Sequence, residues 1–137
     1  MDNTVAPPSP TLLLIEDELH TADLIKLTLQ DIGYEILHVA DGKEAARLID
    51  ALPPPALILL DMELPHVHGL DLLTQIRRKS TWVHVPVVML TAVADKTNIC
   101  KALVGGATEY ILKPFQRDRL RARIEKYHAP GLRKRAS

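Results

Sequence analysis

Polar side chains that could do chemistry follow four short, mainly apolar segments of the chain. They are Glu16 and Asp17, Asp61, Thr91 and Lys113. A carboxylate can act as a nucleophile, and Mg²⁺ prefers a few carboxylates together with water as its ligands. A lysine ammonium adds a mobile positive charge that can meet an anionic group. This chemistry requires a fold that brings residues distant in sequence to one place.

The run before Asp61 is typical of a buried strand. Residues 56–60 are all apolar, and they lie between the prolines at 53–55 and Pro65. The run is too short for a lone buried helix and does not alternate, so we expect a strand covered on both faces. The functional crevice of an open parallel sheet lies at the carboxyl ends of its strands. Asp61 is therefore expected at such a crevice.

Strands and helices alternate along the whole predicted domain. We expect strands at 11–15, 34–40, 56–61, 85–90 and 108–112, and helices near 21–32, 42–52, 72–79, 95–104 and 120–127. In the second helix, Ala45, Leu48, Ile49 and Leu52 follow the i, i+3, i+4, i+7 spacing of a buried face. This alternation predicts an α/β fold, a doubly wound five-stranded parallel sheet with five helices.

Length and composition indicate one globular domain. The 137 residues are 47% hydrophobic and 25% charged, which excludes a disordered chain. Cys100 has no partner for an internal disulfide, and no export signal or apolar span of about 18 residues occurs, so we expect a cytoplasmic protein without a membrane segment. We expect a disordered lead-in at 1–10, the domain at 11–127 and a basic tail at 128–137.

Four motifs occur in a fixed order along the chain. They are Ile15-Glu16-Asp17, then Leu60-Asp61-Met62-Glu63-Leu64-Pro65 with Gly69, then Leu90-Thr91-Ala92, and finally Lys113-Pro114-Phe115. In this order and spacing, residues 11–127 resemble the response-regulator receiver domain of two-component signalling, in its single-domain, chemotaxis-regulator-like form. The resemblance implies the flavodoxin-like receiver fold. It also implies a stand-alone regulator that receives a phosphoryl group from a sensor histidine kinase or a histidine phosphotransfer protein and signals to a downstream protein.

The resemblance assigns the chemistry to particular residues. Asp61 would be the phosphoacceptor, and Mg²⁺ (or Mn²⁺) would be held by Glu16, Asp17, Asp61 and the backbone carbonyl of Glu63. Lys113 would pair with one phosphoryl oxygen, and the hydroxyl of the residue at position 91 would bond another. The domain would be a signalling module and not an enzyme, apart from slow self-dephosphorylation.

By the same resemblance, Thr91 and Tyr110 form a switch. Thr91 would move towards the phosphoryl group and Tyr110 would turn inward, which changes the surface of the fourth helix, fifth strand and fifth helix. That surface would bind the partner or a second copy of the chain. Glu63 and Val93 would tune the rate of phosphoryl hydrolysis, and the peptide bond before Pro114 would be cis.

Three other interpretations stay open for these residues. Glu16 and Asp17 could be a solvated helix cap. The domain could be a phosphatase with an aspartyl nucleophile, although such enzymes would carry an aspartate where this chain has Glu63. It could also be a phosphorylation-independent interaction module, although it has the acid pair, the acceptor and the lysine. His66 and His68 are expected in an exposed loop and not on a metal, because Mg²⁺ prefers oxygen.

The C-terminal part of the chain is a separate electrostatic region. The sequence has 17 basic and 17 acidic residues, but residues 115–137 alone have 8 basic and 2 acidic ones. Arginines at 117, 119, 121 and 123 would spread around the last helix, so a solvated helix and tail is the leading interpretation. Docking to an acidic partner is the second. Nucleic-acid binding is not expected, because no reading module follows. Cys100 is expected to be buried or half-buried.

Overall fold

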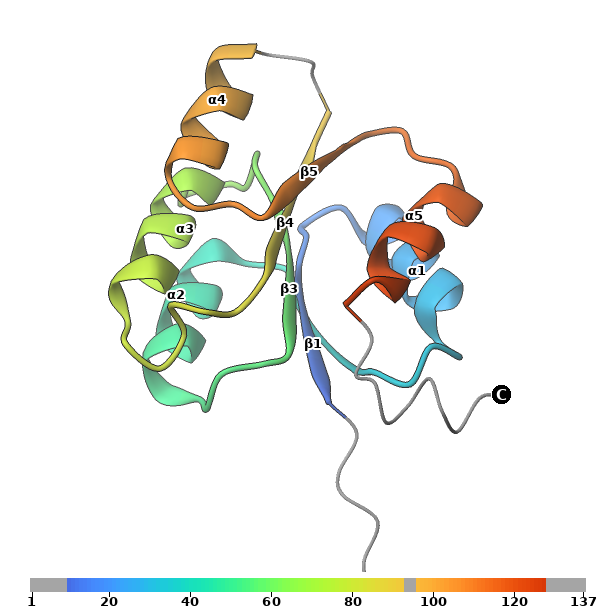
Figure 1. Cartoon of the computed structure of the whole chain (residues 1–137), viewed down its shortest axis with the longest axis horizontal. Coiled ribbons are helices and arrows are strands. Elements are labelled where there is room, and N and C mark those ends of the chain that lie inside the picture. The colour runs from blue at the N-terminus through green and yellow to red at the C-terminus, as the bar shows by residue number, and fades with distance from the viewer. Residues whose placement is uncertain (1–9, 93–95, 128–137) are drawn as a thin grey trace, which may run out of the picture.

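The computed structural model describes residues 10–92 and 96–127, which form one five-stranded sheet with helices on both faces (Figure 1). In chain order the elements are β1 (Thr11–Ile15), α1 (Leu19–Leu29), β2 (Glu35–Val39), α2 (Gly42–Ala51), β3 (Leu57–Asp61), α3 (Gly69–Arg78), β4 (Val87–Thr91), α4 (Lys96–Val104), β5 (Glu109–Leu112) and α5 (Arg117–Glu125). The predicted fold class is confirmed.

The sheet is parallel throughout and has the strand order β2-β1-β3-β4-β5. The chain moves from β1 outward to β2 and then returns to place β3 on the other side of β1. The strand order therefore reverses between β1 and β3, and a crevice forms at their carboxyl ends. Ile15 is paired with Leu60 there, so the residues that follow β1 lie beside the end of β3.

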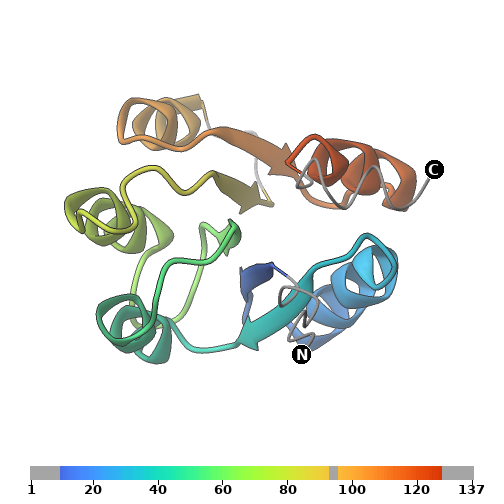
Figure 2. The same cartoon turned by 60° about the horizontal axis from the view of Figure 1, so that its bottom comes forward.

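Two apolar layers enclose the sheet. Helices α2, α3 and α4 cover one face, and α1 and α5 cover the other, as both views show (Figures 1 and 2). All five residues of β3 and all five of β4 are buried, which confirms the strand covered on both faces. Ile58 and Leu60 face the larger helical layer, and Leu57 and Leu59 face α1 and α5. The strand that carries Asp61 is thus held from both sides.

The first helix differs from the prediction at both ends. It begins at Leu19 because the side chain of Glu18 accepts hydrogen bonds from the N–H groups of His20 and Thr21, and so caps the helix. It ends at Leu29, although Ile32 is buried as expected. Similarly, β4 begins at Val87, two residues after the predicted start.

Helix α4 occurs where a helix is predicted, but little of it is buried. Only Ala102 is fully buried among the nine residues of this helix, whereas Leu103 is 43% exposed and Val104 is 90% exposed. Cys100, which was expected to be buried or half-buried, is exposed as well. The helix lies towards the side of the sheet that ends in the edge strand β5, so fewer neighbours are available to cover it. Local spacing cannot reveal this position.

Arg77, in the last turn of α3, joins the α3–β4 and α4–β5 segments at the end of the sheet away from the crevice. Its guanidinium donates to the carbonyls of Gly106 (2.9 Å), Val83 (3.1 Å) and Val85 (2.7 Å). The nearby Trp82 is fully buried, and its indole N–H donates to the carbonyl of Leu52. These bonds fix the segments that enter β4 and β5.

None of the helices in the described ranges is both long and apolar enough to cross a membrane. The expected lead-in and basic tail fall almost entirely at 1–9 and 128–137, outside the described residues. Pro10 is described, and its carbonyl accepts a hydrogen bond from Glu35 N–H at the start of β2.

Candidate functional site

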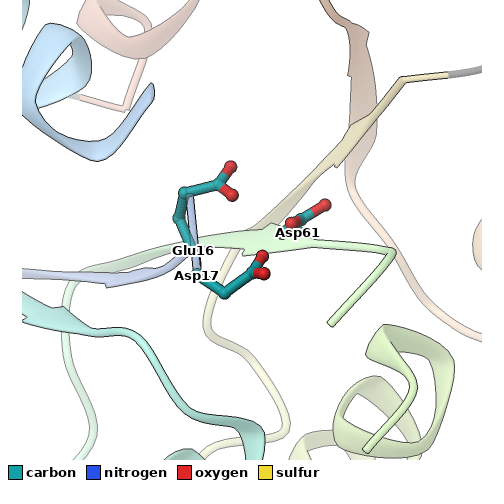
Figure 3. A group of neighbouring side chains, drawn as sticks. All are labelled: Glu16, Asp17 and Asp61. Carbon is teal, nitrogen blue, oxygen red and sulfur yellow. The ribbon is translucent and has the colours of Figure 1, made fainter. Parts of the chain in front are cut away.

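Three carboxylates meet at the crevice between β1 and β3 (Figure 3). Glu16 and Asp17 follow β1, and Asp61 is the last residue of β3. One carboxylate oxygen from each residue lies within 4.8 Å of the others. Glu16 and Asp61 are buried, whereas Asp17 is half-buried. The strand-end prediction for these three residues therefore agrees with their positions.

Lys113 brings a positive charge to the same place from the end of β5. Its Nζ lies 2.6 Å from Glu16 Oε1 and 3.4 Å from Asp61 Oδ1. Its backbone N–H donates to the carbonyl of Thr91, which ties the end of β5 to the end of β4. The peptide bond between Lys113 and Pro114 is cis, as expected.

Burial and neighbouring charge shift the pKa values of two groups in the crevice. Burial, and next the hydrogen bond with the Glu16 carboxyl, raise the pKa of Asp61 to about 7, although the N–H of Glu63 and the charge of Lys113 oppose the rise. Burial lowers the pKa of Lys113, but its contacts with Glu16 and Asp61 outweigh burial and raise it overall. Negative charge is therefore in excess at the crevice, which a cation would relieve.

The carboxylate oxygens fit a hard divalent cation. Mg²⁺ binds through oxygen ligands, often with only one or two carboxylates from the protein. The buried Oε1 of Glu16 has the ammonium of Lys113, 2.6 Å away, as its ionic partner. Three carboxylates share this one lysine, and buried negative charge without a counter-charge is costly, so a bound divalent cation would neutralise the excess. His66 and His68 are exposed and are not in the cluster, as expected.

Residues 12–125 match the family model of the response regulator receiver domain. The chain belongs to this family. Receiver domains are signalling domains of two-component systems that act between histidine kinases and downstream effectors. The family explains why an acid cluster, a hydroxyl and a lysine come to one sheet edge from four different strands.

Curated relatives fall into two groups. The chain is 33% identical over 115 residues to the chemotaxis protein CheY1 of Helicobacter pylori. This match covers 83% of this chain and 93% of CheY1. It is 36% identical over 116 residues to the phosphate regulon transcriptional regulatory protein PhoB of Pseudomonas aeruginosa. That match covers 84% of this chain and 50% of PhoB. The chain thus spans about half the length of the transcriptional regulators it matches.

Solved structures give the same fold. The chemotaxis response regulator CheY4 of Vibrio cholerae matches with a TM-score of 0.79 and 26% identity, over 87% of this chain and 98% of CheY4. The receiver domain of a sensor histidine kinase from Pseudomonas aeruginosa PAO1 matches with a TM-score of 0.76 and 32% identity, over 88% of this chain and 97% of that domain. That receiver domain was solved with a magnesium ion coordinated in its active site cleft.

The structure describes three of the four other residues predicted for the receiver site. Thr91 is buried at the end of β4, one position after Leu90, the register partner of Asp61. Glu63 donates its backbone N–H to Asp61 Oδ1 (3.1 Å), and its Oε1 accepts from Ala92 N–H (3.4 Å). Tyr110 on β5 is half-buried and packs against the core beneath α2, α3 and α4. Val93 lies outside the described residues.

Gly69 allows α3 to begin directly against the end of the strand that carries Asp61. A Cβ atom at this position would lie 2.6 Å from the carbonyl oxygen of Asp61 and 2.7 Å from the Cα of Met62. Only glycine permits such an approach without a shift of the backbone. His68 precedes it and caps α3, since its Nδ1 accepts the N–H of Leu70.

Sequence reasoning missed the contribution of His38. Its Nε2 lies 2.8 Å from the backbone oxygen of Glu16, so β2 supports the turn that presents the first two acids. The register pairs His38 with Leu14, near the carboxyl end of β1. The available signal was a polar residue in an otherwise apolar stretch of a predicted strand.

The arginines of α5 are largely engaged within the chain. Arg117 donates to the hydroxyl of Thr28 on α1, and Arg121 forms an ion pair with Asp31. Arg123 pairs with Glu109 on β5 at 3.0 Å. These contacts replace part of the solvated arrangement that was expected and attach α5 to its neighbours.

Proposed function

We propose that the chain is a phosphoacceptor response regulator in which Asp61 takes the phosphoryl group from a sensor histidine kinase or a histidine phosphotransfer protein. The observation that carries this proposal is the convergence of Glu16, Asp17, Asp61 and Lys113 at the carboxyl edge of the sheet. Membership of the receiver family supports it. The relatives CheY1 and PhoB differ in output, so the kinase and the downstream protein are left unnamed.

In the proposed reaction, a carboxylate oxygen of Asp61 attacks the phosphorus of the donor. The new bond joins that oxygen to phosphorus, the bond from phosphorus to the donor breaks, and its electron pair leaves with the donor group. Lys113 Nζ, already 3.4 Å from Asp61 Oδ1, would pair with a phosphoryl oxygen. The Thr91 hydroxyl would donate to another. The product is an aspartyl phosphate.

We assign the magnesium site to Glu16, Asp17, Asp61 and the backbone carbonyl of Glu63. A bound Mg²⁺ (or Mn²⁺) would neutralise charge between the attacking carboxylate and the anionic phosphoryl group. The burial of the Glu16 carboxylate and the grouping of the three carboxylates support this assignment.

Output is proposed to use the surface of α4, β5 and α5. Phosphorylation would draw Thr91 towards the crevice and let Tyr110 turn further inward, which shifts the population between two packings. A groove of about 960 Å³ crosses this surface, with Leu103, Tyr110 and Arg119 among its lining residues. A downstream protein or a second copy of the chain would bind there.

The lifetime of the aspartyl phosphate is proposed to depend on Glu63 and Val93. Glu63 adds negative charge at the mouth of the crevice, and Val93 would exclude water, so we expect slow hydrolysis. Phosphate release from the labelled protein measures this rate. Fast release that Val93→Glu leaves unchanged would contradict the proposal.

The decisive experiment is intact-mass spectrometry after incubation with acetyl phosphate and Mg²⁺. We expect the wild type to gain one phosphoryl group and Asp61→Asn to gain none. Asp71→Asn removes an exposed carboxylate on α3 and should label like the wild type. Full labelling of Asp61→Asn would overturn the assignment. Rapid catalytic release of phosphate by the wild type would instead favour a phosphatase, and binding to a partner without labelling would favour an interaction module.

A further inference from the structure

A small pocket lies beside the acid cluster, between α1 and the segment that follows β5. We call it the α1 pocket, and its volume is about 280 Å³. It is lined by Thr21, Leu24, Ala92, Lys113, Pro114 and Phe115. Four of these six residues are apolar. Lys113 also contacts Glu16 and Asp61, so the pocket and the phosphoacceptor site share one side chain.

The residues of the α1 pocket are not explained by core packing alone. Ala22, Ile25 and Leu29 bury the inner face of α1 in the core. Leu24 lies on the same helix, is only half-buried, and lines the pocket. Phe115 is also half-buried, at the margin of that core. Apolar side chains therefore remain accessible next to a strongly charged site.

We propose that the α1 pocket holds the acyl chain of small acyl phosphates. The domain should therefore prefer donors whose apolar chain is a few carbons long, such as butyryl phosphate, over acetyl phosphate. This inference rests on the proposed phosphoacceptor function. In the reaction, an oxygen of Asp61 bonds to phosphorus, the bond from phosphorus to the acyl oxygen breaks, and the donor leaves as a carboxylate with that electron pair. No proton or further reactant is needed.

Two features of the pocket fit this class of donor. The leaving carboxylate is anionic, and Lys113 supplies a positive charge on the wall shared with the site. The attached chain is apolar and would contact Leu24 and Phe115. Pockets for small molecules usually measure roughly 300 to 1,000 Å³, so this pocket suits a chain of only a few carbons.

The test compares the rate constants for labelling of Asp61 by acetyl phosphate and butyryl phosphate, both at low concentration with saturating Mg²⁺. Leu24→Ala removes the apolar wall, and Leu27→Ala removes a leucine of the same helix that is 51% exposed and outside the pocket. For each protein, the ratio of the butyryl to the acetyl rate constant cancels differences in the fraction of active protein. Comparing this ratio between variants cancels the intrinsic reactivity of the donors.

Each buried methylene is expected to favour binding by about fourfold, so the ratio in the wild type should exceed that in Leu24→Ala by roughly fivefold or more. Leu27→Ala should match the wild type. An equal ratio in wild type and Leu24→Ala overturns the proposal. So does a Leu24→Ala defect seen only with a protein donor, because the pocket would then receive a protein side chain.

A second measurement separates this proposal from the proposed function. Butyrylphosphonate cannot transfer its phosphorus group, so its binding can be followed by NMR titration of wild type, Leu24→Ala and Leu27→Ala. Weaker binding by Leu24→Ala alone supports the pocket, whether or not Asp61 is labelled. Failure of every acyl phosphate to label Asp61 would then reject the phosphoacceptor role and leave the pocket in place. Equal binding by all three proteins overturns the pocket while leaving that role intact.

Discussion

The acid crevice and the α4 side of the domain are built in opposite ways. Asp61 is 3% exposed and ends a strand whose residues are all buried, whereas α4 has a single fully buried residue and Val104 is 90% exposed. Buried strands hold charged groups at fixed distances, which phosphoryl chemistry requires. A loosely covered helix can change position at low cost. The difference shows that one small domain can hold its charged site rigidly and still leave its proposed output surface free to change.

The largest expected effect comes from shortening one leucine in each region. Leu59→Ala in β3 should lower the free energy of unfolding by about 3 kcal/mol, because it leaves a cavity in a closed layer. Leu103→Ala in α4 should lower it by less than about 1 kcal/mol, since that side chain is already 43% exposed. Urea denaturation followed by fluorescence of Trp82, the single tryptophan of the chain, measures both. Equal losses would break the comparison.

The second effect is the stability cost of ionising Asp61 in the crevice. The pKa of Asp61 is raised to about 7, above its usual value in an unfolded chain, so ionisation of this group costs stability as pH rises from about 4 to 7. In EDTA, Asp61→Asn should therefore exceed the wild type in unfolding free energy by about 2 kcal/mol at pH 8 and by little at pH 4.

Asp71→Asn, on the exposed surface of α3, is the control for this pH series. Its stability difference from the wild type should change with pH much less than that of Asp61→Asn. A stability difference between Asp61→Asn and the wild type that stays constant over this pH range would contradict a cost of ionising Asp61.

The third effect separates the two roles of positive charge at the crevice. Lys113→Met removes a cation next to Glu16 and Asp61, so Mg²⁺ should bind about fivefold more tightly, as expected from roughly 1 kcal/mol of removed repulsion. Labelling by acetyl phosphate should nevertheless fall, because the phosphoryl oxygen loses its partner. Isothermal titration and intact-mass kinetics give the two values.

The matched control is Lys126→Met, which removes an exposed lysine that pairs with Glu109. Neither value should change in this variant. Weaker Mg²⁺ binding by Lys113→Met would mean that the lysine organises the acids and does not compete with the ion.

The smallest effect lies at the link between the two regions. Glu63 Oε1 accepts the N–H of Ala92, just after β4, and puts a negative charge where an anionic donor must approach. Glu63→Gln should raise the labelling rate by about twofold at low ionic strength, and salt should reduce the gain. Glu35→Gln, on the exposed start of β2, should leave the rate unchanged. A slower Glu63→Gln would indicate that its carboxylate helps to organise the site.

The sequence was sufficient for the crevice because its residues follow apolar runs directly. A run such as 57–60 is too short for a lone buried helix and suits a buried strand. Parallel strands present their ends at one edge, so Asp61 could be placed beside Glu16 and Asp17. The outer side of the fold was harder. Leu103 has the spacing of a buried residue, but its exposure depends on where α4 lies over the sheet. His38 was missed because its bond to Glu16 depends on strand order.

The three carbonyl contacts of Arg77 have a mechanical consequence for α4. Gly106, which closely follows this helix, is anchored through its carbonyl to α3, at the end of the sheet opposite the acids. The helix is thus clamped near its C-terminus, and its other end adjoins the segment after Thr91. Any displacement of α4 should therefore be a pivot about the Gly106 end, with its widest swing beside the crevice.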